Sequence, residues 1–316
     1  MEVARRGAFW ELAGDVLGLP EPIVNVYLVG RPGAGDRGWT LVDTGLPGMA
    51  GRIVHAAQAR FGPGARPAAI VLTHGHFDHT GHLAELAERW DVPVYAHRLE
   101  LPYLTGRSAY PPPDPTVGGG LMTRLSVLFP RGPLDLGARA RALPDDGSVP
   151  NLPGWRTIHT PGHAPGHVSF FRETDRLLIA GDAFVTTKQE SALAALTKPI
   201  AMHGPPASFT PDWAASKRSV EALAALHPAI AGTGHGRPLS GPDLDTGLQA
   251  LARDFDRVAL PASGRYVPQS AVTDERGVVS VPPAAPDPFP RLALGIVLAA
   301  LGALVAVRWR PAARPN

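Results

Sequence analysis

The sequence predicts an α/β protein with mixed β-sheets. Between residues 20 and 260, short runs rich in β-branched and aromatic residues alternate with segments that have the apolar spacing of helices. Some of these runs are joined by polar turns, as in hairpins, and others by helical segments, as in βα units. Hydrophobic residues make up 44% of the 316 residues, which is enough to bury a sizeable core.

The first half of the chain combines a hairpin with βα units. Residues 23–29 and 39–42 are apolar runs separated by a turn rich in Gly and Pro, so they predict antiparallel strands. A helix over 50–61, a strand over 68–72, a His-rich loop over 73–80, a helix over 82–90 and a strand over 92–96 follow in that order. This combination is typical of a mixed sheet.

The second half shows the same alternation. Three strands are expected over 155–159, 168–171 and 177–180, and two helices over 212–226 and 244–260. The segment between the halves, about residues 101–150, is rich in Pro and Gly and has an apolar stretch at 121–129. Because long irregular segments in compact domains usually serve a function, we expect this insertion to fold over the site as a lid.

The C-terminal segment predicts a membrane-anchoring helix. Residues 292–307 are sixteen residues without a polar side chain, preceded by Arg291 and followed by Arg308, Trp309 and Arg310. At about 1.5 Å per residue they span roughly 24 Å, and flanking arginines can make up the difference from a hydrocarbon layer of ~30 Å. The alternative is a helix buried against the domain.

These observations predict the domain organisation. Residues 1–260 are expected to form the main domain with its insertion, residues 261–290 a hairpin-like and Pro-rich linker, and residues 291–310 the membrane anchor. The N-terminus lacks the apolar run of a secretory signal, so we expect the domain to lie on the cytoplasmic side. The protein would be soluble and cytoplasmic if the C-terminal helix is buried.

Charge and cysteine content exclude several classes of function. The 30 basic and 28 acidic residues leave a net charge of +2, so we expect no nucleic-acid partner. The chain has no Cys, which excludes disulfides, iron–sulfur clusters and a cysteine nucleophile. Any metal must therefore be bound by His and carboxylate side chains.

The loop at 73–80 concentrates such side chains. His74, His76, Asp78 and His79 lie within six residues, directly after a predicted buried strand and before a predicted helix. Alternate residues of an extended segment point the same way, so His74 and His76 can bind one ion while Asp78 and His79 bind a second.

Three further candidates follow apolar runs far away in the sequence: His163, Asp182 and His235. Each is preceded by Gly, which allows the backbone to approach a metal closely. The sequence therefore predicts seven ligands for two divalent metal ions. Zn suits His and Asp ligands, and Fe or Mn are also possible.

The order of these motifs, with Asp43-Thr44-Gly45 upstream, resembles the metallo-β-lactamase superfamily, and the form Pro161 to His167 is similar to its glyoxalase II-like branch. The resemblance implies a four-layered αββα sandwich of two mixed β-sheets with the metals at its edge. It implies that His74, His76 and His163 hold one metal, that Asp78, His79 and His235 hold the other, and that Asp182 bridges them.

The chemistry that follows is metal-dependent hydrolysis of a small molecule. Coordination by two cations lowers the pKa of water, so a metal-bridging hydroxide can attack an ester-like carbonyl, either a thioester or a lactone. Asp78 is then both a ligand and the catalytic acceptor of the nucleophile's proton. Asp182 argues against a β-lactam as the natural substrate, because β-lactamases of this superfamily commonly lack a bridging Asp.

Four residues are candidates for supporting roles. Asp43, His82 and His167 are expected to hold ligands from behind or to pack beside them, and His203 is the best candidate for a substrate contact. Tyr103, Tyr110 and Phe129 could line the mouth of the site if the insertion covers it. The sequence does not predict the oligomeric state.

Three alternative functions stay open at this point. A phosphodiester hydrolase would place positive side chains near the site, for which Arg107 and Arg237 are the candidates. An iron-dependent enzyme would consume oxygen. A non-catalytic metal-binding protein at a membrane would bind metal tightly without turnover.

Overall fold

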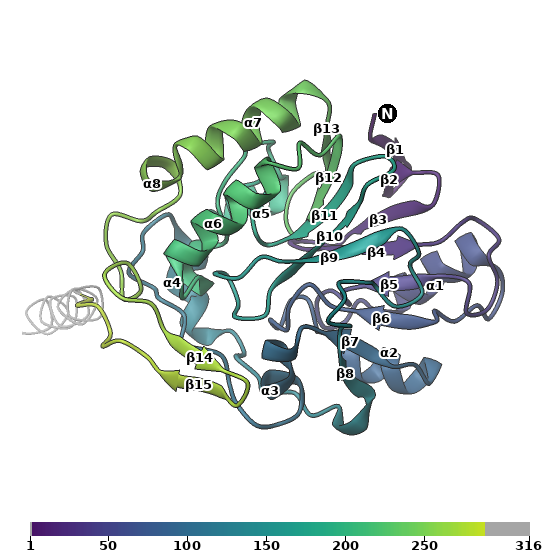
Figure 1. Ribbon diagram of the computed structural model, residues 1–316, viewed down its shortest axis with the longest axis horizontal. Coiled ribbons are helices and arrows are strands. Elements are labelled where there is room, and N and C mark those ends of the chain that lie inside the picture. Colours follow the sequence, from purple (N-terminus) through teal and green to yellow (C-terminus); the bar gives the residue numbers. More distant parts are fainter. Residues whose placement is uncertain (1, 288–316) are drawn as a thin grey trace, which may run out of the picture.

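We describe residues 2–287 of a computed structural model of the chain. Two β-sheets pack face to face, and helices cover the outer face of each sheet (Figure 1). The predicted α/β class with mixed sheets is therefore confirmed, and the layer order is helix, sheet, sheet, helix. The predicted C-terminal helix at 291–310 lies outside the described residues.

The first sheet contains eight strands in the order of the sequence. They are β1 (Ala4–Arg6), β2 (Phe9–Ala13), β3 (Val16–Pro20), β4 (Asn25–Val29), β5 (Thr40–Val42), β6 (Ala69–Val71), β7 (Val94–Ala96) and β8 (Ala140–Ala142). Strands β1 to β5 are antiparallel, and β5 to β8 are parallel. Because the parallel strands end at the same edge, the loops after β5 and β6 lie side by side.

The second sheet contains five strands in the order β13-β12-β11-β10-β9. They are β9 (Trp155–His159), β10 (Val168–Arg172), β11 (Leu177–Gly181), β12 (Ile230–Thr233) and β13 (Leu239–Ser240). The pair β11 and β12 is parallel, and the other pairs are antiparallel. The loops that follow β11 and β12 therefore leave the sheet at one edge.

Three apolar clusters hold these layers together. Between the sheets, residues such as Tyr27 and Val71 of the first sheet pack against Phe170 and Ile179 of the second. On the outside of the first sheet lie α1 (Ala50–Phe61) and α2 (Leu83–Trp90), and on the outside of the second lie α6 (Trp213–Ala224) and α7 (Pro242–Arg253). Each of these helices buries one apolar face, as its spacing predicts.

The structure differs from the sequence-based expectation in three places. The N-terminal strands β1, β2 and β3 were not predicted; Gly18 and Pro20 disfavour a strand, yet Gly18 is accommodated because the Leu12 and Tyr27 side chains fill the space beside it. The strand β12 extends the short apolar run before His235. The helix expected over 244–260 ends at Arg253, and the break at Asp254 turns the buried Phe255 into the core before α8 (Phe255–Val258).

The segment 101–150 is partly regular. It contains α3 (Leu101–Leu104), α4 (Leu121–Leu125), the 3-10 turns η2 (Ser126–Leu128) and η3 (Gly137–Arg139), and the edge strand β8. Another 3-10 turn, η1 (Arg98–Glu100), precedes it. In the second half of the chain, η4 (Ala207–Phe209) contacts this segment, because the amide of Asp114 donates to the carbonyl of Ser208 at 2.7 Å, and the short helix α5 (Ala192–Thr197) follows β11.

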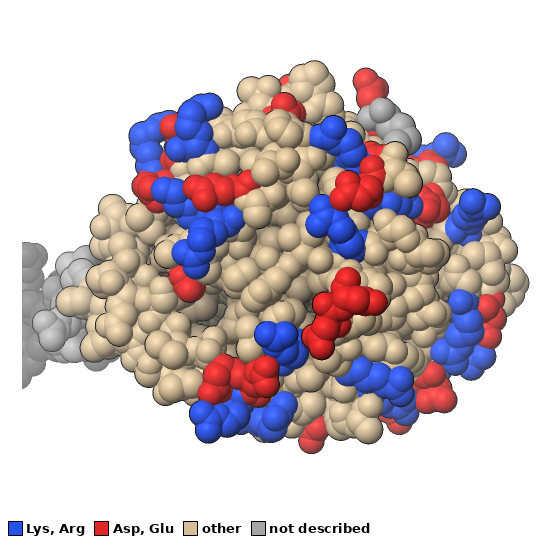
Figure 2. All heavy atoms as spheres, viewed as in Figure 1, with Lys and Arg blue, Asp and Glu red and all other residues tan. Residues whose placement is uncertain are grey.

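A two-stranded hairpin ends the described part of the chain. It is formed by β14 (Val272–Asp274) and β15 (Gly277–Ser280), and the amide of Val278 donates to the Ser108 hydroxyl at 3.1 Å. Within residues 2–287, no helix is long and apolar enough to span a membrane. Basic and acidic side chains are interspersed over the face shown in Figure 2, which therefore carries no extended patch of one sign.

Candidate metal centre

A carboxylate from the end of the neighbouring strand fixes the start of the loop after β6. Asp43 follows β5, and its Oδ1 accepts the backbone amide of Thr73 at 2.8 Å while its Oδ2 accepts the Thr73 hydroxyl at 2.8 Å. Asp43 has a φ of 61°, a strained conformation for a residue with a Cβ. The two hydrogen bonds hold the residue in this conformation, so the strand end and the His-rich loop stay together.

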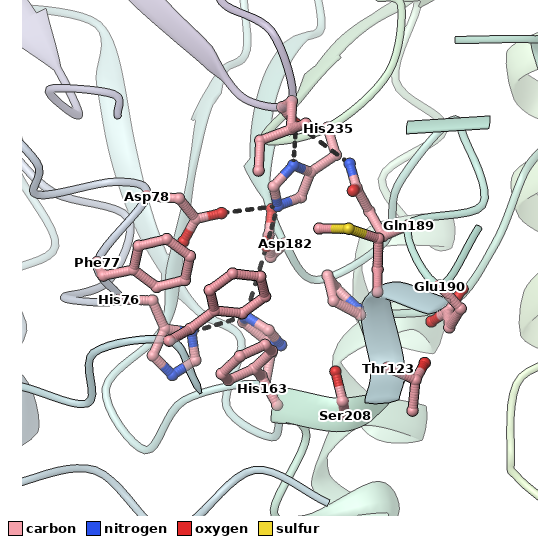
Figure 3. Close-up of a pocket in the computed structure, with 15 residues that line it drawn as sticks. His76, Phe77, Asp78, Thr123, His163, Asp182, Gln189, Glu190, Ser208 and His235 are labelled. Carbon is pink, nitrogen blue, oxygen red and sulfur yellow. Dashed lines mark hydrogen bonds and ion pairs between the residues drawn. The ribbon is translucent and has the colours of Figure 1, made fainter. Parts of the chain in front are cut away.

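The structure brings all seven predicted ligands together in a buried cluster (Figure 3). Their ligating atoms form three groups of three side chains, and the atoms within each group lie within 4.8 Å of one another. The groups are His74, His76 and His163; His74, His79 and Asp182; and Asp78, His79 and His235. The first and third groups are the two metal sites that the resemblance implies.

Asp182 lies between these two groups. Its Oδ2 is 2.9 Å from Nε2 of His235, 3.4 Å from Nε2 of His163 and 3.6 Å from Nε2 of His79. The residue directly follows β11, and its backbone amide donates to Nε2 of His167 at 2.8 Å. One carboxylate oxygen therefore reaches imidazoles of both groups, as a bridging ligand must.

The outward nitrogens of four imidazoles are held by the protein. The Nδ1 atom of His79 donates to Asp43 at 2.8 Å, and that of His235 donates to the carbonyl of Ile23. The Nδ1 atoms of His74 and His163 lie 3.1 Å and 3.3 Å from the hydroxyls of Thr73 and Thr210. Because both hydroxyls donate elsewhere, to Asp43 and to the Pro206 carbonyl, they accept from the imidazoles, and each Nε2 keeps its lone pair for the interior.

Unpartnered buried atoms show that the cluster fits a bound cation. Nε2 of His74, Nε2 of His79 and Oδ1 of Asp182 are buried without a hydrogen-bond partner. Leaving such atoms unpaired is costly unless a ligand satisfies them. Gly234 contributes as well, because a Cβ there would lie 2.0 Å from Oδ1 of Asp182. The donor set of imidazole and carboxylate suits Zn, Fe or Mn.

The electrostatics of the cluster divide its imidazoles into two sets. Burial opposes the charge of His79 and His235, but Asp182 and the neighbouring carboxylates hold the pKa of both above the ordinary value. Burial dominates at the other three imidazoles and favours their neutral form. Burial, followed by the neighbouring imidazoles, lowers the pKa of His74 and His163 well below the ordinary value and that of His76 to about 3. Burial opposes the charge of Asp182, but His235 and His79 hold its pKa well below its usual range. Neutral imidazole and ionised carboxylate are the forms that bind metals.

Glu100 is a supporting residue that the sequence did not reveal. It is fully buried in η1, and its Oε2 accepts the amide of Gly75 at 2.9 Å and the hydroxyl of Tyr110. Its Oε1 accepts the amide of Gly166 at 2.7 Å. Gly75 lies between two ligands and Gly166 lies three residues after His163, so Glu100 ties two ligand-bearing loops together.

A second support that the sequence did not reveal reaches His235 from the first sheet. Nδ2 of Asn25 donates to the carbonyls of Thr233 and Gly236, at 2.9 Å and 2.8 Å, and the Tyr27 hydroxyl donates to Thr233 at 2.7 Å. These contacts join residues more than two hundred positions apart. The two carbonyls belong to residues on either side of His235, so these contacts fix the turn that carries this ligand.

The other predicted supporting histidines lie in three different settings. His167 lies behind the cluster, where it accepts the Asp182 amide and bonds Thr160 at 2.8 Å. His82 bonds the Met49 amide at 2.6 Å and Glu85 at 2.9 Å. His203 pairs through its backbone with Val185, and it is not among the residues that line the pocket described next.

A pocket opens onto the cluster and has about 510 Å³ of space including its mouth. Its lining residues are Ile23, His76, Phe77, Asp78, Met122, Thr123, Phe129, His163, Asp182, Gln189, Glu190, Pro206, Ser208, Phe209 and His235. Phe129 lines the mouth as predicted. Tyr103 and Tyr110 do not line this pocket; both rings are buried and stack on each other with centroids 3.9 Å apart. The ring of Tyr110 packs on the predicted ligand His76 from behind, with centroids 4.5 Å apart.

Two packed mixed sheets bring five His and two Asp together at the ends of their strands. This fold and this site define the class of the metal-dependent hydrolases. The model of the metallo-beta-lactamase superfamily matches residues 19–235. The chain belongs to this superfamily. The predicted metal-dependent hydrolase is thereby confirmed at the level of the superfamily, whose members typically bind two metal ions.

Individual relatives agree with this assignment. The chain is 48% identical over 254 residues to the probable metallo-hydrolase YflN of Bacillus subtilis (strain 168), a match that covers 80% of this chain and 96% of that protein. It is 34% identical over 152 residues to a hydroxyacylglutathione hydrolase of Xylella fastidiosa (strain M23), covering 46% and 43%. A beta-lactamase domain protein from Burkholderia ambifaria has the same fold, with a TM-score of 0.53, 22% identity and coverage of 80% and 78%.

Proposed function

We propose that this protein is a dinuclear metal-dependent hydrolase that cleaves an ester-like carbonyl compound, either a thioester or a lactone. The observation that carries the proposal is the position of Asp182, whose Oδ2 reaches imidazoles of both ligand groups. His74, His76 and His163 would hold one ion, Asp78, His79 and His235 the other, and Asp182 both.

The side chains around the cluster would have different roles in the reaction. Two divalent ions, when bound, supply a water that is nucleophilic near neutral pH and polarise the carbonyl. Asp78 reaches the pocket, with its Oδ2 at 3.4 Å from Nε2 of His235, so it can take the proton of the attacking water. The same carboxylate can return that proton to the leaving group. Asp43 and Glu100 keep the ligand loops in place and do not touch the substrate.

The test is turnover by the full chain loaded with zinc, on a glutathione thioester, an acyl lactone, a cephalosporin and an activated phosphodiester. We expect hydrolysis of the thioester or the lactone. Loss of a residue behind a metal ligand typically costs 10 to 100-fold in affinity or activity, so we expect Asp182→Ala to cost more than about a hundredfold. Metal content is measured on the same samples, and Zn, Fe and Mn are loaded in turn.

The matched control is Glu221→Gln, which removes an exposed carboxylate on α6. It should leave both turnover and metal content unchanged. Two bound metals with no hydrolysis of any of the four substrates would contradict the proposal. Oxygen uptake by the iron-loaded protein would then identify the oxygen-consuming alternative, and its absence would favour a non-catalytic metal-binding protein.

The glyoxalase II-like branch remains a proposal within the superfamily. The match to a hydroxyacylglutathione hydrolase supports it over about half of each chain. The phosphodiester alternative expects cationic side chains at the site, but within residues 2–287 no Lys or Arg lines the pocket. Hydrolysis of the phosphodiester in the panel would decide for that alternative.

The domain organisation and the location in the cell are also proposals. We propose residues 1–260 as the catalytic domain with its insertion at about 101–150, residues 261–290 as the linker and residues 291–310 as a membrane anchor with the domain on the cytoplasmic side. The apolar run at 292–307 supports the anchor. Fractionation of cells tests it: the full chain should sediment with membranes and a chain ending at Asp287 should not. Equal distribution of both chains would contradict it.

A further inference from the structure

Three phenylalanines form one wall of the pocket. Phe77 comes from the ligand loop, Phe129 from the segment after η2 and Phe209 from η4. The ring centroids of Phe77 and Phe129 are 5.1 Å apart in a stacked arrangement, and Phe209 lies 6.4 Å and 6.3 Å from them. All three rings are only half-buried by the protein itself, so they leave apolar surface free beside the metal cluster.

The remainder of the pocket offers no positive side chain to an anionic substrate. The charged side chains that line it are the three carboxylates Asp78, Asp182 and Glu190. The first two belong to the metal cluster, whereas Glu190 lies across the pocket beside Thr123 (Figure 3). A negative group at that far side would therefore be repelled by Glu190, and no Lys or Arg among the described lining residues would compensate.

Thr123 supplies a neutral hydrogen-bonding group at the same far side. Its side chain is 1% exposed, and its Oγ1 has no hydrogen-bond partner in the part of the chain that the structure describes. A buried hydroxyl without a partner is costly, and a bound ligand that pairs with it recovers the cost. Ser208 faces the pocket beside Thr123 (Figure 3).

We propose that the substrate is an uncharged ester or lactone with an apolar group that lies on Phe77, Phe129 and Phe209, and with a neutral polar group that bonds Thr123. This inference rests on the proposed hydrolase function and names the substrate class of the same site. In the reaction, the oxygen of water bonds to the carbonyl carbon and the acyl C–O bond breaks. One proton goes to the alcohol oxygen, and the acid product ionises.

The experiment measures both turnover and binding with the full chain loaded with zinc. The turnover substrates are p-nitrophenyl esters of unbranched acids of increasing length, each paired with its counterpart that ends in a carboxylate. Burial of each methylene is worth about 0.8 kcal/mol, so kcat/KM should rise about fourfold per methylene until the wall is covered. We expect each neutral ester to exceed its charged counterpart by at least tenfold.

Binding is measured with methyl hexyl ketone, which is the neutral ketone and is not hydrolysed, and with two counterparts that end in a carboxylate (the charged ketone) or in a hydroxyl. The neutral ketone should bind more tightly than the charged one. Phe129→Ala should weaken binding of methyl hexyl ketone about tenfold or more. Thr123→Val should weaken binding of the counterpart that ends in a hydroxyl about fivefold, as expected for one buried hydrogen bond, and should leave binding of methyl hexyl ketone unchanged. Glu190→Gln should reduce the difference in Kd between the neutral ketone and the charged ketone.

Matched controls separate local effects from general ones. Leu128→Ala removes the exposed side chain next to Phe129, and Glu221→Gln removes a carboxylate far from the pocket; neither should change binding or turnover. Equal binding of the neutral and the charged ketone, or tighter binding of the charged one, would overturn the inference. Preferential binding of the neutral ketone without turnover of any ester would support the pocket's selectivity and contradict the hydrolase function, so the two failures are distinguishable.

Discussion

Replacing Glu100 by Ala should weaken both the fold and the metal site. The carboxylate accepts two backbone amides, those of Gly75 and Gly166, and the hydroxyl of Tyr110. All of these groups are buried, so Glu100→Ala leaves two donors, the Gly166 amide and the Tyr110 hydroxyl, without an acceptor. The Gly75 amide keeps the Tyr110 hydroxyl oxygen as an acceptor at 2.9 Å. Each unpaired donor costs about 1–3 kcal/mol.

The net cost is smaller than the sum, because burial also penalises the carboxylate. Burial raises the pKa of Glu100 above its ordinary value, although the hydrogen bonds from Tyr110, Gly166 and Gly75 oppose the rise. Removing the side chain relieves that penalty, and we expect a net loss of about 2–4 kcal/mol. For a chain of this size the loss corresponds to a decrease in Tm of about 3–7 °C.

Two assays check this prediction. Thermal unfolding gives Tm, and competition with a chromophoric chelator gives the affinity for zinc, which should fall about 10 to 100-fold because both ligand loops loosen. Glu88→Ala, which removes an exposed carboxylate on α2, is the matched control. If Glu100→Ala unfolds at the wild-type temperature and binds zinc as tightly, Glu100 does not hold the loops together.

Three other predictions concern packing, pH and metal. Gly232→Ala should cost about 1–3 kcal/mol in urea unfolding, since the added methyl group would lie 2.6 Å from the Tyr27 ring; an unchanged midpoint would contradict this. Burial and the stacked His159 ring lower the pKa of His97 to about 4. As the pH falls, the unfolded chain therefore binds a proton at His97 before the folded chain does, and the free energy of unfolding decreases from pH 6.5 toward pH 4. His97→Gln should reduce that slope, measured by unfolding at several pH values, and an identical slope would exclude the effect. Removing metal with a chelator should lower Tm, and restoring zinc should raise it again. At a free zinc concentration a thousandfold above Kd, binding adds about 4 kcal/mol to the free energy of unfolding. A Tm independent of metal would count against the site.

The ligands could be predicted because each one has a local signature in the sequence. His74, Asp182 and His235 follow apolar runs that end in the sheets, and strand ends at one edge of a sheet converge whatever their separation along the chain. Apolar spacing likewise placed strands β4 to β7 and β9 to β11 and helices α1, α2 and α6 within a few residues of their observed bounds.

Some supporting residues could not be predicted because their partners are distant in the sequence. Glu100 sits in a 3-10 turn without a motif, and its role depends on amides 25 and 66 residues away. Asn25 gains its role from carbonyls more than two hundred residues later. Thr123 was part of an apolar stretch of uncertain structure, and its unpaired hydroxyl is visible only when the pocket is assembled around it. Propensity describes local backbone preferences and carries no information about such contacts.

The metal centre is divided between the two sheets in a way that links it to the order of folding. Each of the three ligand groups takes two side chains from the loop after β6 and a third from a loop of the second sheet: His163, Asp182 or His235. The N-terminal half emerges from the ribosome first and carries four of the seven ligands, yet it completes none of the groups. Tight metal binding therefore requires that the two sheets have already packed together, and a bound ion then links the two sheets across their interface. Metal occupancy would report that the whole chain has been assembled correctly, not merely that one sheet has formed.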